Sequence, residues 1–210
     1  MKKSGSITTL LLDIGDVLLN DGWDHNARKR AAMSFKLKLS ELNDRHHLVF
    51  ETYEQGKLTL KEYLDLVVFY EKRSFTPNQF RKFMFAQSKP YPEMIELIRR
   101  LKAKYGMKIV AVSNEGRELN EFRIHKFKLN SVIDFFISSC FVHIRKPDVD
   151  IFRLALEFIQ TPACQVLYIE NTPMFTEVAE SFGIRSILHT NYKSTYAKLV
   201  ALGLDELEGR

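Results

Sequence analysis

One short stretch limits the fold of this chain more than any other: an apolar run over residues 7–12 that ends in Asp13. A continuous apolar run of this length, bounded by turn residues, is typical of a strand buried on both faces, as in parallel sheets. In open α/β sheets, ligands bind just outside the carboxyl ends of the strands. We therefore predict that Asp13 is a nucleophile. The alternative is that Asp13 caps a following helix.

The rest of the chain divides into two patterns. Residues 19–88 have helical apolar spacing, and two capping signals, Thr59-Leu60-Lys61-Glu62 and Thr76-Pro77-Asn78-Gln79, open helices. We expect four helices here, at 25–38, 40–53, 59–70 and from 76. From residue 92 onward, helices and short apolar strands alternate. The expected strands are 107–112, 135–138, 166–169 and 185–188, and the expected helices are 92–105, 115–127, 147–158, 172–182 and 194–202.

This alternation requires right-handed crossovers and a mostly parallel sheet. We predict an α/β fold in which a Rossmann-like, five-stranded parallel sheet lies between helices. Residues 1–18 and 89–210 would form this core domain, and residues 19–88 an inserted four-helix-bundle cap. Because parallel strands end at one edge of the sheet, polar residues that follow the strands should meet there. These residues are Asp13, Ser113, Asn114, Glu170 and Asn171, with Lys146 at the start of a nearby helix.

Composition excludes several classes of function. The 31 basic and 26 acidic residues give a net charge of +5, and the basic residues are scattered over helical patterns, so we predict no nucleic-acid binding. No stretch approaches the roughly 20 apolar residues of a membrane span, and the N-terminus lacks an apolar signal core. Cys140 and Cys164 lie far apart, as free thiols in a reducing compartment would. We expect a cytoplasmic protein without membrane contact.

Four ordered motifs resemble those of the haloacid dehalogenase superfamily, which is dominated by phosphatases. The first is Leu-Leu-Leu-Asp13-Ile-Gly-Asp-Val, and the second ends in Val-Ser113-Asn114. The third is Arg-Lys146-Pro-Asp-Val-Asp-Ile-Phe, and the fourth is Tyr-Ile-Glu170-Asn171. The sequence from Glu54 to Thr59 also resembles a turn found in the helical caps of this family.

The resemblance implies a Mg²⁺-dependent phosphatase that acts on a small phosphorylated metabolite, similar to sugar-phosphate phosphatases. Asp13 would attack the phosphoryl group and form an aspartyl-phosphate. The Ser113 hydroxyl and the Asn114 backbone N–H would hold phosphate oxygens. Lys146 would offset negative charge, and we expect it to lower the pKa of Asp13. The implied metal ligands are Asp13, the Gly15 carbonyl, and Glu170 or Asn171. The sequence does not indicate an oligomeric state.

The first motif departs from the family's pattern at Gly15, where the family has a second Asp that acts as general acid and base. The neighbouring Asp16 should point elsewhere, because side chains alternate along a strand. Asp21, Asp24 and His25, where the cap begins, are other candidate proton donors. Each of them is more typical of a helix cap or a surface position.

The fourth motif departs at Asn171, where an amide replaces a carboxylate and lowers the negative charge of the metal site by one. Together with Gly15, this change supports an alternative, a catalytically impaired relative that binds a ligand or a protein partner. A third alternative is a 2-haloacid dehalogenase. Phe175, at a position where those enzymes carry an Asp, argues against it.

Overall fold

Five parallel strands form the centre of the molecule. The computed structural model describes residues 6–205, so the predicted limits at residues 1 and 210 lie outside the described residues. The strands occur in the order β3-β2-β1-β4-β5. This order and the flanking helices confirm the predicted α/β fold class. The bounds of the five strands are β1 Thr9–Leu12, β2 Lys108–Ser113, β3 Phe135–Ser138, β4 Val166–Glu170 and β5 Arg185–Leu188.

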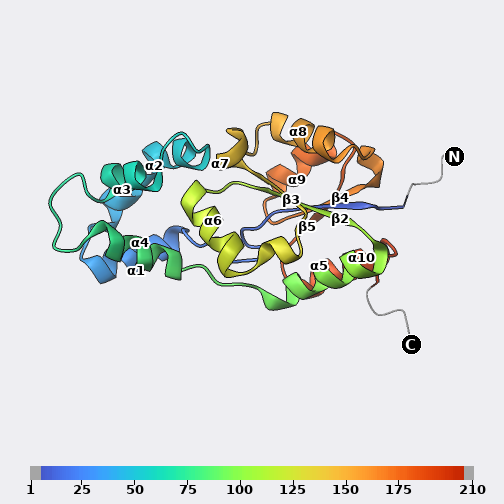
Figure 1. Ribbon diagram of the computed structural model, residues 1–210, viewed down its shortest axis with the longest axis horizontal. Coiled ribbons are helices and arrows are strands. Elements are labelled where there is room, and N and C mark those ends of the chain that lie inside the picture. The colour runs from blue at the N-terminus through green and yellow to red at the C-terminus, as the bar shows by residue number, and fades with distance from the viewer. Residues whose placement is uncertain (1–5, 206–210) are drawn as a thin grey trace.

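The central strand β1 is buried on both faces, as its apolar sequence predicts. Leu10 and Leu12 pack with α5 (Pro92–Tyr105) and α10 (Tyr192–Ala201), whereas Leu11 packs with α8 (Asp150–Ile159) and α9 (Pro173–Glu180). This division follows from the two-residue period of a strand. Figure 1 shows α8 and α9 on one side of the sheet and α5 and α10 on the other. A further helix, α6 (Arg117–Lys126), and a short 3-10 turn, η1 (Leu129–Ser131), follow β2, and a second such turn, η2 (Ala163–Gln165), precedes β4.

Four helices at the other end of the molecule form the unit that we call the cap (Figure 1). They are α1 His25–Phe35, α2 Leu39–Glu54, α3 Leu60–Val67 and α4 Pro77–Ala86, which confirms the inserted helices. Both predicted capping boxes form, at Thr59 and Thr76. Helix α3 ends earlier than expected because Phe69 turns inward onto Phe75, with 5.5 Å between their ring centroids.

Two chain segments connect the cap to the sheet, and they run side by side. The Asn20 N–H donates to the Lys89 carbonyl over 2.9 Å, and the Asn20 side chain accepts from the Lys89 N–H over 2.7 Å. The Tyr91 N–H donates to the Leu18 carbonyl over 2.8 Å. The two segments therefore meet the sheet at one place. The proposed domain division at residues 18/19 and 88/89 lies within this pair of connections.

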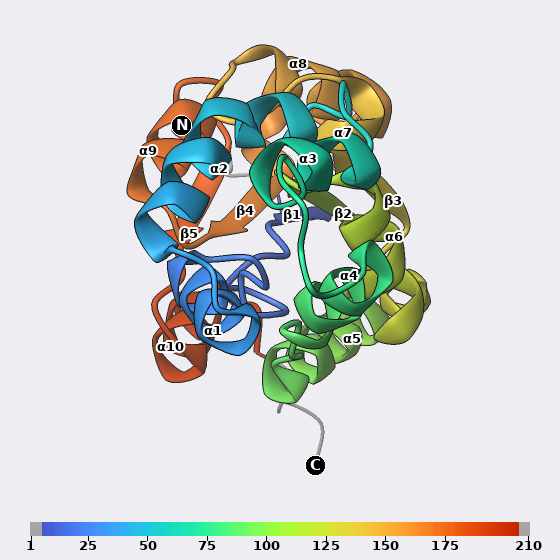
Figure 2. The ribbon, with the colours of Figure 1, turned by 90° about the vertical axis from the view of Figure 1, so that its left-hand side faces the viewer.

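The cap also contacts the sheet part of the molecule directly; Figure 2 gives the view from the cap end, with the cap in front. The contact includes a short helix that the sequence pattern did not indicate, α7 (Ser139–Val142). The Ser139 hydroxyl donates to the Glu54 carbonyl over 2.6 Å. A Cβ added to Gly56 would lie 2.2 Å from the Cys140 carbonyl oxygen, and one added to Gly116 would lie 2.0 Å from the Tyr53 ring. Only glycine fits at these two positions.

Two helices begin later than the sequence predicts. Helix α8 begins at Asp150 rather than Pro147, because Asp148 forms a turn: its N–H donates to the Arg145 carbonyl, and its carboxylate accepts from the Asp150 N–H over 3.0 Å. Helix α6 begins at Arg117 rather than residue 115, because the Glu115 N–H donates to the Ser139 hydroxyl instead. Within residues 6–205, no helix has the length and apolar character needed to cross a membrane.

Candidate active site

The predicted polar residues meet at the carboxyl edge of the sheet. Leu12 of β1 pairs in register with Ala111 of β2 and Ile169 of β4, so the three strands end at one level. Asp13 continues the ladder by donating its N–H to the Ile169 carbonyl over 3.0 Å. A pocket of about 180 Å³ lies at this edge, and we call it the Asp13 pocket. Its lining includes Asp13, Gly15, Ser113, Asn114, Lys146 and Asn171.

A buried cluster of charges lies behind this pocket. The Lys146 side chain is only 1% exposed, and its Nζ lies 3.1 Å from Asp13 Oδ1 and 2.5 Å from Glu170 Oε2. It also donates to the Tyr168 hydroxyl over 3.0 Å. Burying an ammonium group is costly unless it is paired and hydrogen-bonded. Here two carboxylates and a hydroxyl supply the partners, so the position of Lys146 beside Asp13 is firmly determined.

Asn114 holds the backbone of Lys146. Its side-chain amide donates to the Lys146 carbonyl over 2.9 Å and accepts from the Lys146 N–H over 2.8 Å. This pair of bonds joins the end of β2 to the loop before α8. The sequence suggested only a backbone role for Asn114. The structure adds a side-chain role, because the amide places the residue that pairs with Asp13.

Glu170 faces Lys146, and both of its carboxylate oxygens have partners. Oε1 accepts from the N–H groups of Asn171 and Thr172, each over 2.9 Å, and Oε2 accepts from Lys146 and from the Tyr168 hydroxyl. Asn171, by contrast, is partly exposed and lines the Asp13 pocket. Sequence reasoning missed Tyr168. Its only signal was a hydroxyl-bearing residue two positions before Glu170, on the same side of a buried strand.

The electrostatics of Asp13 differ from the sequence-based expectation. The pKa of Asp13 is raised to about 6, mainly by burial and to a smaller extent by the charge of Glu170. Lys146 and a hydrogen bond from Ser113 act in the opposite direction, but they do not outweigh burial. Lys146 lowers the pKa of Asp13, as expected from the sequence, but burial outweighs it and the net shift is upward. Burial disfavours the charged form of Lys146 as well, yet the charges of Asp13 and Glu170 raise its pKa.

The pocket is lined by oxygen-bearing groups of the kind that bind a magnesium ion. Asp13 Oδ1 pairs with Lys146, and the Asp13 carboxylate, Gly15 and Asn171 line the same space. Mg²⁺ prefers oxygen ligands, and in proteins it is held by one or two carboxylates together with waters and substrate phosphates. Residues 6–205 contain no group of three or more His, Cys, Asp or Glu side chains placed to hold a metal ion. The carboxylates of Asp16, Asp21 and Glu54 also line this pocket, so the negative charge near a bound cation does not come from Asp13 alone.

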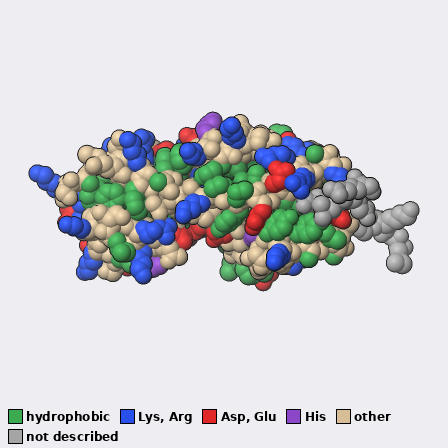
Figure 3. Space-filling view, turned by 90° about the horizontal axis from the view of Figure 1, so that it is seen from below, with side chains coloured by type: hydrophobic (Ala, Val, Ile, Leu, Met, Phe, Trp, Pro, Cys, Tyr) green, Lys and Arg blue, Asp and Glu red, His purple; other side chains and the backbone are tan. Residues whose placement is uncertain are grey.

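A second pocket of about 260 Å³ adjoins the first on the side of the cap. We call it the cap-side pocket. Asp21, Glu54 and Asn114 line both pockets. Aromatic and histidine side chains of the cap, including Trp23, His46, Phe50 and Tyr53, line the second pocket alone. Figure 3 shows a waist between the cap and the sheet part, with acidic side chains gathered there. The two pockets together form one site with a charged end and an aromatic end.

The three candidate donors where the cap begins take different positions. Asp24 caps α1, with its carboxylate accepting from the Ala27 N–H over 2.6 Å. The His25 ring lies 3.4 Å from the Asn43 amide. Asp21 faces the Asp13 pocket, where burial and then the charge of Asp16 raise its pKa. Asp16 itself has a left-handed backbone, φ +50°, and its carboxylate accepts from the Asp21 N–H.

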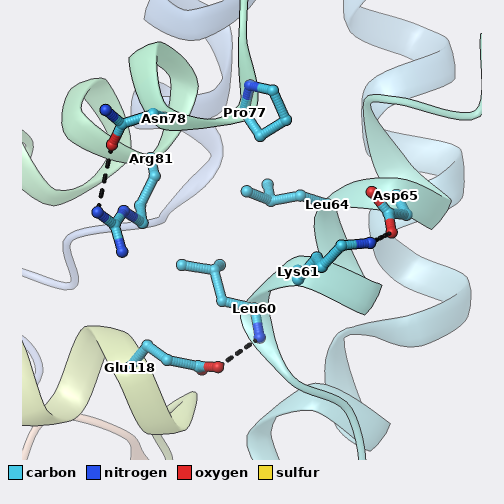
Figure 4. A pocket seen from close by; sticks show the side chains of 8 residues that line it. All are labelled: Leu60, Lys61, Leu64, Asp65, Pro77, Asn78, Arg81 and Glu118. Carbon is cyan, nitrogen blue, oxygen red and sulfur yellow. Dashed lines mark hydrogen bonds and ion pairs between the residues drawn. The ribbon is translucent and has the colours of Figure 1, made fainter.

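A larger cavity, of about 540 Å³, lies elsewhere, between α3, α4 and α6. In Figure 4, Leu60 and Leu64 point into it, whereas Lys61 pairs with Asp65. Its other polar groups also bind one another: Glu118 accepts from the Leu60 N–H, and Arg81 donates to Asn78. None of the four motifs lines this cavity. The Asp13 pocket is therefore the candidate active site.

Comparisons with known proteins give one family match that covers most of the chain. The sequence matches the family described as haloacid dehalogenase-like hydrolase over residues 7–183. It is 26% identical over 189 residues to drimenol cyclase drtB of Aspergillus calidoustus, a match that covers 87% of this chain and 34% of that protein. The chain thus spans about a third of the length of that curated relative.

Among solved structures, the fold is similar to that of HAD family enzyme bt-2542 from Bacteroides thetaiotaomicron. The TM-score is 0.76 at 19% identity, over 89% of this chain and 95% of that one. A variant of that enzyme in which one aspartate is replaced by alanine, solved with magnesium and inorganic phosphate, gives 0.76 at 17% identity, over 91% and 100%. A predicted HAD-like hydrolase of Porphyromonas gingivalis gives 0.75 at 18% identity, over 98% and 100%.

Proposed function

The chain belongs to the haloacid dehalogenase-like hydrolase family, and we propose that within it the protein hydrolyses a small phosphomonoester, such as a sugar phosphate, through Asp13. One observation carries the proposal. The Asp13 carboxylate lines a small pocket and lies 3.1 Å from a buried lysine ammonium that two further groups hold in place. A carboxylate beside a fixed positive charge is arranged to attack an electrophile that arrives as an anion.

In this proposal Asp13 attacks phosphorus, and the bond to the leaving oxygen breaks. Lys146 offsets the negative charge of the carboxylate and of the incoming phosphate. The Ser113 hydroxyl donates a hydrogen bond to Asp13 and orients the attacking carboxylate; when phosphate is bound, the same hydroxyl can turn and donate to a phosphate oxygen instead. With a pKa of about 6, Asp13 is ionised in most molecules at pH 7 and is more basic than an exposed aspartate. Water then hydrolyses the aspartyl-phosphate.

We assign the metal-binding role to Asp13, the Gly15 carbonyl and Asn171. When bound there, Mg²⁺ supplies Lewis-acid stabilisation of the phosphoryl oxygens. Both oxygens of Glu170 already accept hydrogen bonds within the chain, so this residue acts on Asp13 through Lys146. The magnesium and phosphate bound to the Bacteroides relative support this assignment. The size of the two adjoining pockets, about 180 and 260 Å³, favours a small leaving group.

A second candidate function is binding of a phosphorylated ligand without turnover. Gly15 carries no side chain beside Asp13, and the amide of Asn171 faces the pocket where a second carboxylate would strengthen metal binding. Both features lower the catalytic capacity of the site, and neither removes Asp13, Ser113 or Lys146.

The deciding experiment measures phosphate release from a panel of phosphomonoesters, with Mg²⁺ and with a chelator. We expect Mg²⁺-dependent turnover that falls on the order of 10³-fold or more in Asp13→Asn, because the amide cannot serve as nucleophile. Asp44→Asn, at an exposed position on α2, is the matched control and should keep full activity.

Unchanged phosphate release in Asp13→Asn would exclude the proposed mechanism. Inorganic phosphate that binds without any turnover would favour the second candidate. Release of chloride from 2-chloropropionate, without release of phosphate from the esters, would establish the dehalogenase alternative.

A further inference from the structure

The proposed reaction needs a proton at the oxygen that leaves phosphorus. An alkoxide leaving group is strongly basic, and a positioned general acid typically contributes about 10²–10⁴ in rate. Gly15, two residues after the nucleophile, has no side chain to supply that proton. Another acidic side chain at the two pockets, one that is not bound to another group, would have to supply it.

Most of the acidic groups at the junction of the pockets already have partners. Glu54 pairs with Arg145 over 2.9 Å, and Glu115 pairs with Arg123 over 2.6 Å. Asp24 caps α1. Each of these three carboxylates is therefore already engaged by an ion pair or a hydrogen bond.

Asp16 and Asp21 remain. One oxygen of Asp16 accepts from the Asp21 N–H over 3.1 Å and from the Tyr91 hydroxyl over 3.4 Å. Among the described residues, none forms a hydrogen bond or ion pair with the Asp21 carboxylate. Asp21 lines both the Asp13 pocket and the cap-side pocket, so it lies where phosphate and leaving group would meet.

The backbone of Asp21 is held on both sides. Its N–H donates to Asp16, and its carbonyl accepts from the Trp23 N–H over 2.8 Å and from Arg123 Nη1 over 3.4 Å. Arg123 is in turn fixed by the buried Glu115. A side chain on this anchored turn faces the pocket from the segment that connects sheet and cap.

The position of Asp21 matches the space above Gly15. A Cβ added to Gly15 would lie 3.7 Å from Asp21 Oδ1 and 3.9 Å from Asp13 Oδ2. The gap left by the missing side chain therefore lies between these two carboxylates. We propose that Asp21 is the proton donor to the leaving oxygen, and that it supplies from the cap connection the group that residue 15 lacks. This inference rests on the proposed function.

The proposed steps balance. As an Asp13 oxygen bonds to phosphorus, the electron pair of the breaking bond goes to the leaving oxygen, which takes the proton of the Asp21 carboxylic acid. The products are an alcohol, the aspartyl-phosphate and the Asp21 carboxylate. In the second step water attacks phosphorus, and its proton passes to Asp21. Asp13 is released as carboxylate together with inorganic phosphate.

The test uses two substrates that differ in how much they need an acid. The p-nitrophenolate group leaves without a proton, whereas ethanol leaving from ethyl phosphate requires one. We expect Asp21→Asn to lower kcat/KM for ethyl phosphate about 10²–10⁴-fold and for p-nitrophenyl phosphate less than about 10-fold. Asp24→Ser retains a good helix cap, and it should leave the ratio of the two kcat/KM values unchanged.

A second variant keeps the inference falsifiable. A Cβ at residue 15 meets its nearest neighbours at 3.7–3.9 Å, which is ordinary van der Waals contact, so Gly15→Asp added to Asp21→Asn should restore at least about a tenth of the ethyl phosphate activity. Equal losses on both esters, or no loss on ethyl phosphate, would overturn the role of Asp21.

These outcomes separate the two proposals. If Asp13→Asn abolishes turnover while Asp21→Asn behaves as wild type on ethyl phosphate, only the assignment of Asp21 fails. If the wild-type protein releases phosphate from neither ester, or Asp13→Asn retains full activity, the proposed function fails and the assignment of Asp21 fails with it.

Discussion

The sheet side and the cap side of the candidate site are built in different ways. On the sheet side, Asp13, Lys146 and Glu170 are buried charges that contact one another at strand ends. On the cap side, His46 and Tyr53 lie on a helix that reaches the sheet part through close backbone contacts. The chemistry of the site therefore depends on ion pairing, whereas its cap wall depends on packing.

Because of this difference, the two sides of the site tolerate different amino-acid substitutions. A buried charge that loses its partner keeps its full desolvation cost, so the sheet side tolerates few substitutions. Aromatic and histidine side chains on the cap can change the shape of the pocket while the nucleophile remains in place. Variants on each side should consequently fail in different ways, and three of them test this comparison.

The largest effect is expected for Lys146→Met. Removal of the ammonium group leaves the carboxylates of Asp13 and Glu170 buried near each other without a cation, which should cost about 3–5 kcal/mol of unfolding free energy at pH 7. Phosphate release should fall on the order of 10³-fold or more, because Asp13 loses its counter-charge. Urea unfolding and the phosphate assay measure the two effects.

Lys61→Met is the control, since Lys61 is exposed on α3 and pairs with the partly exposed Asp65. It should change neither the urea midpoint nor turnover. An unfolding free energy in Lys146→Met equal to that of the wild type would show that the buried pairs do not stabilise the fold.

The second-largest effect is expected at Gly56, where the cap contacts α7. Gly56 and Gly106 both have a left-handed backbone, with φ +66° and +62°. A Cβ on Gly56 would approach the Cys140 carbonyl to 2.2 Å, whereas one on Gly106 would meet nothing within 4 Å. Both alanine variants carry backbone strain of about 1 kcal/mol. Gly56→Ala should cost about 1–3 kcal/mol more, because the cap must move away from α7.

Trp23, the single tryptophan, packs in the cap and donates to the Tyr63 hydroxyl, so its fluorescence follows the cap. In Gly56→Ala, urea unfolding followed by this fluorescence should occur at lower urea than unfolding followed by circular dichroism. Equal costs for the two alanine variants would mean that the contact between Gly56 and Cys140 does not hold the cap.

The sequence predicted the sheet side well because strand ends are encoded locally. An apolar run followed by a polar residue marks a strand and its end, and parallel strands bring such ends together. The five strands and the grouping of Asp13, Ser113 and Lys146 at one edge follow from that rule. The role of Tyr168 does not, because in sequence it is one more bulky residue of a buried strand.

On the cap side, the sequence predicted the helices but not which side chains face the pocket. Which of Asp21, Asp24 and His25 faces the pocket depends on how two connecting segments turn, and that is determined by distant partners such as Arg123. Helix α7 is equally invisible in the pattern, since its four residues are ordered by contacts with Glu54 and Gly56. Contacts between residues far apart in sequence leave no periodic signal.

The smallest effect is expected inside the cap, at His46. Trp23 donates to the Tyr63 hydroxyl over 2.9 Å, and that hydroxyl lies 2.7 Å from His46 Nδ1. The network is complete when neutral His46 accepts a hydrogen bond from the Tyr63 hydroxyl. Burial, together with the charges of Arg28 and His47, lowers the pKa of His46 to about 3. A proton on His46 would leave the Tyr63 hydroxyl without an acceptor.

The sign of the pH dependence follows from this lowered pKa. An unfolded histidine takes up a proton near pH 6.5, whereas folded His46 does so only near pH 3. The stabilisation is complete above pH 6.5 and is lost as the pH falls toward 3. When the pH falls from 7 to 4.5, His46 should lower the unfolding free energy of the wild type by about 2 kcal/mol. His46→Gln should lose about that much less over the same interval, and His125→Gln, at an exposed position on α6, should match the wild type. If His46→Gln and the wild type lose stability equally, the neutral-histidine network does not hold the cap wall together.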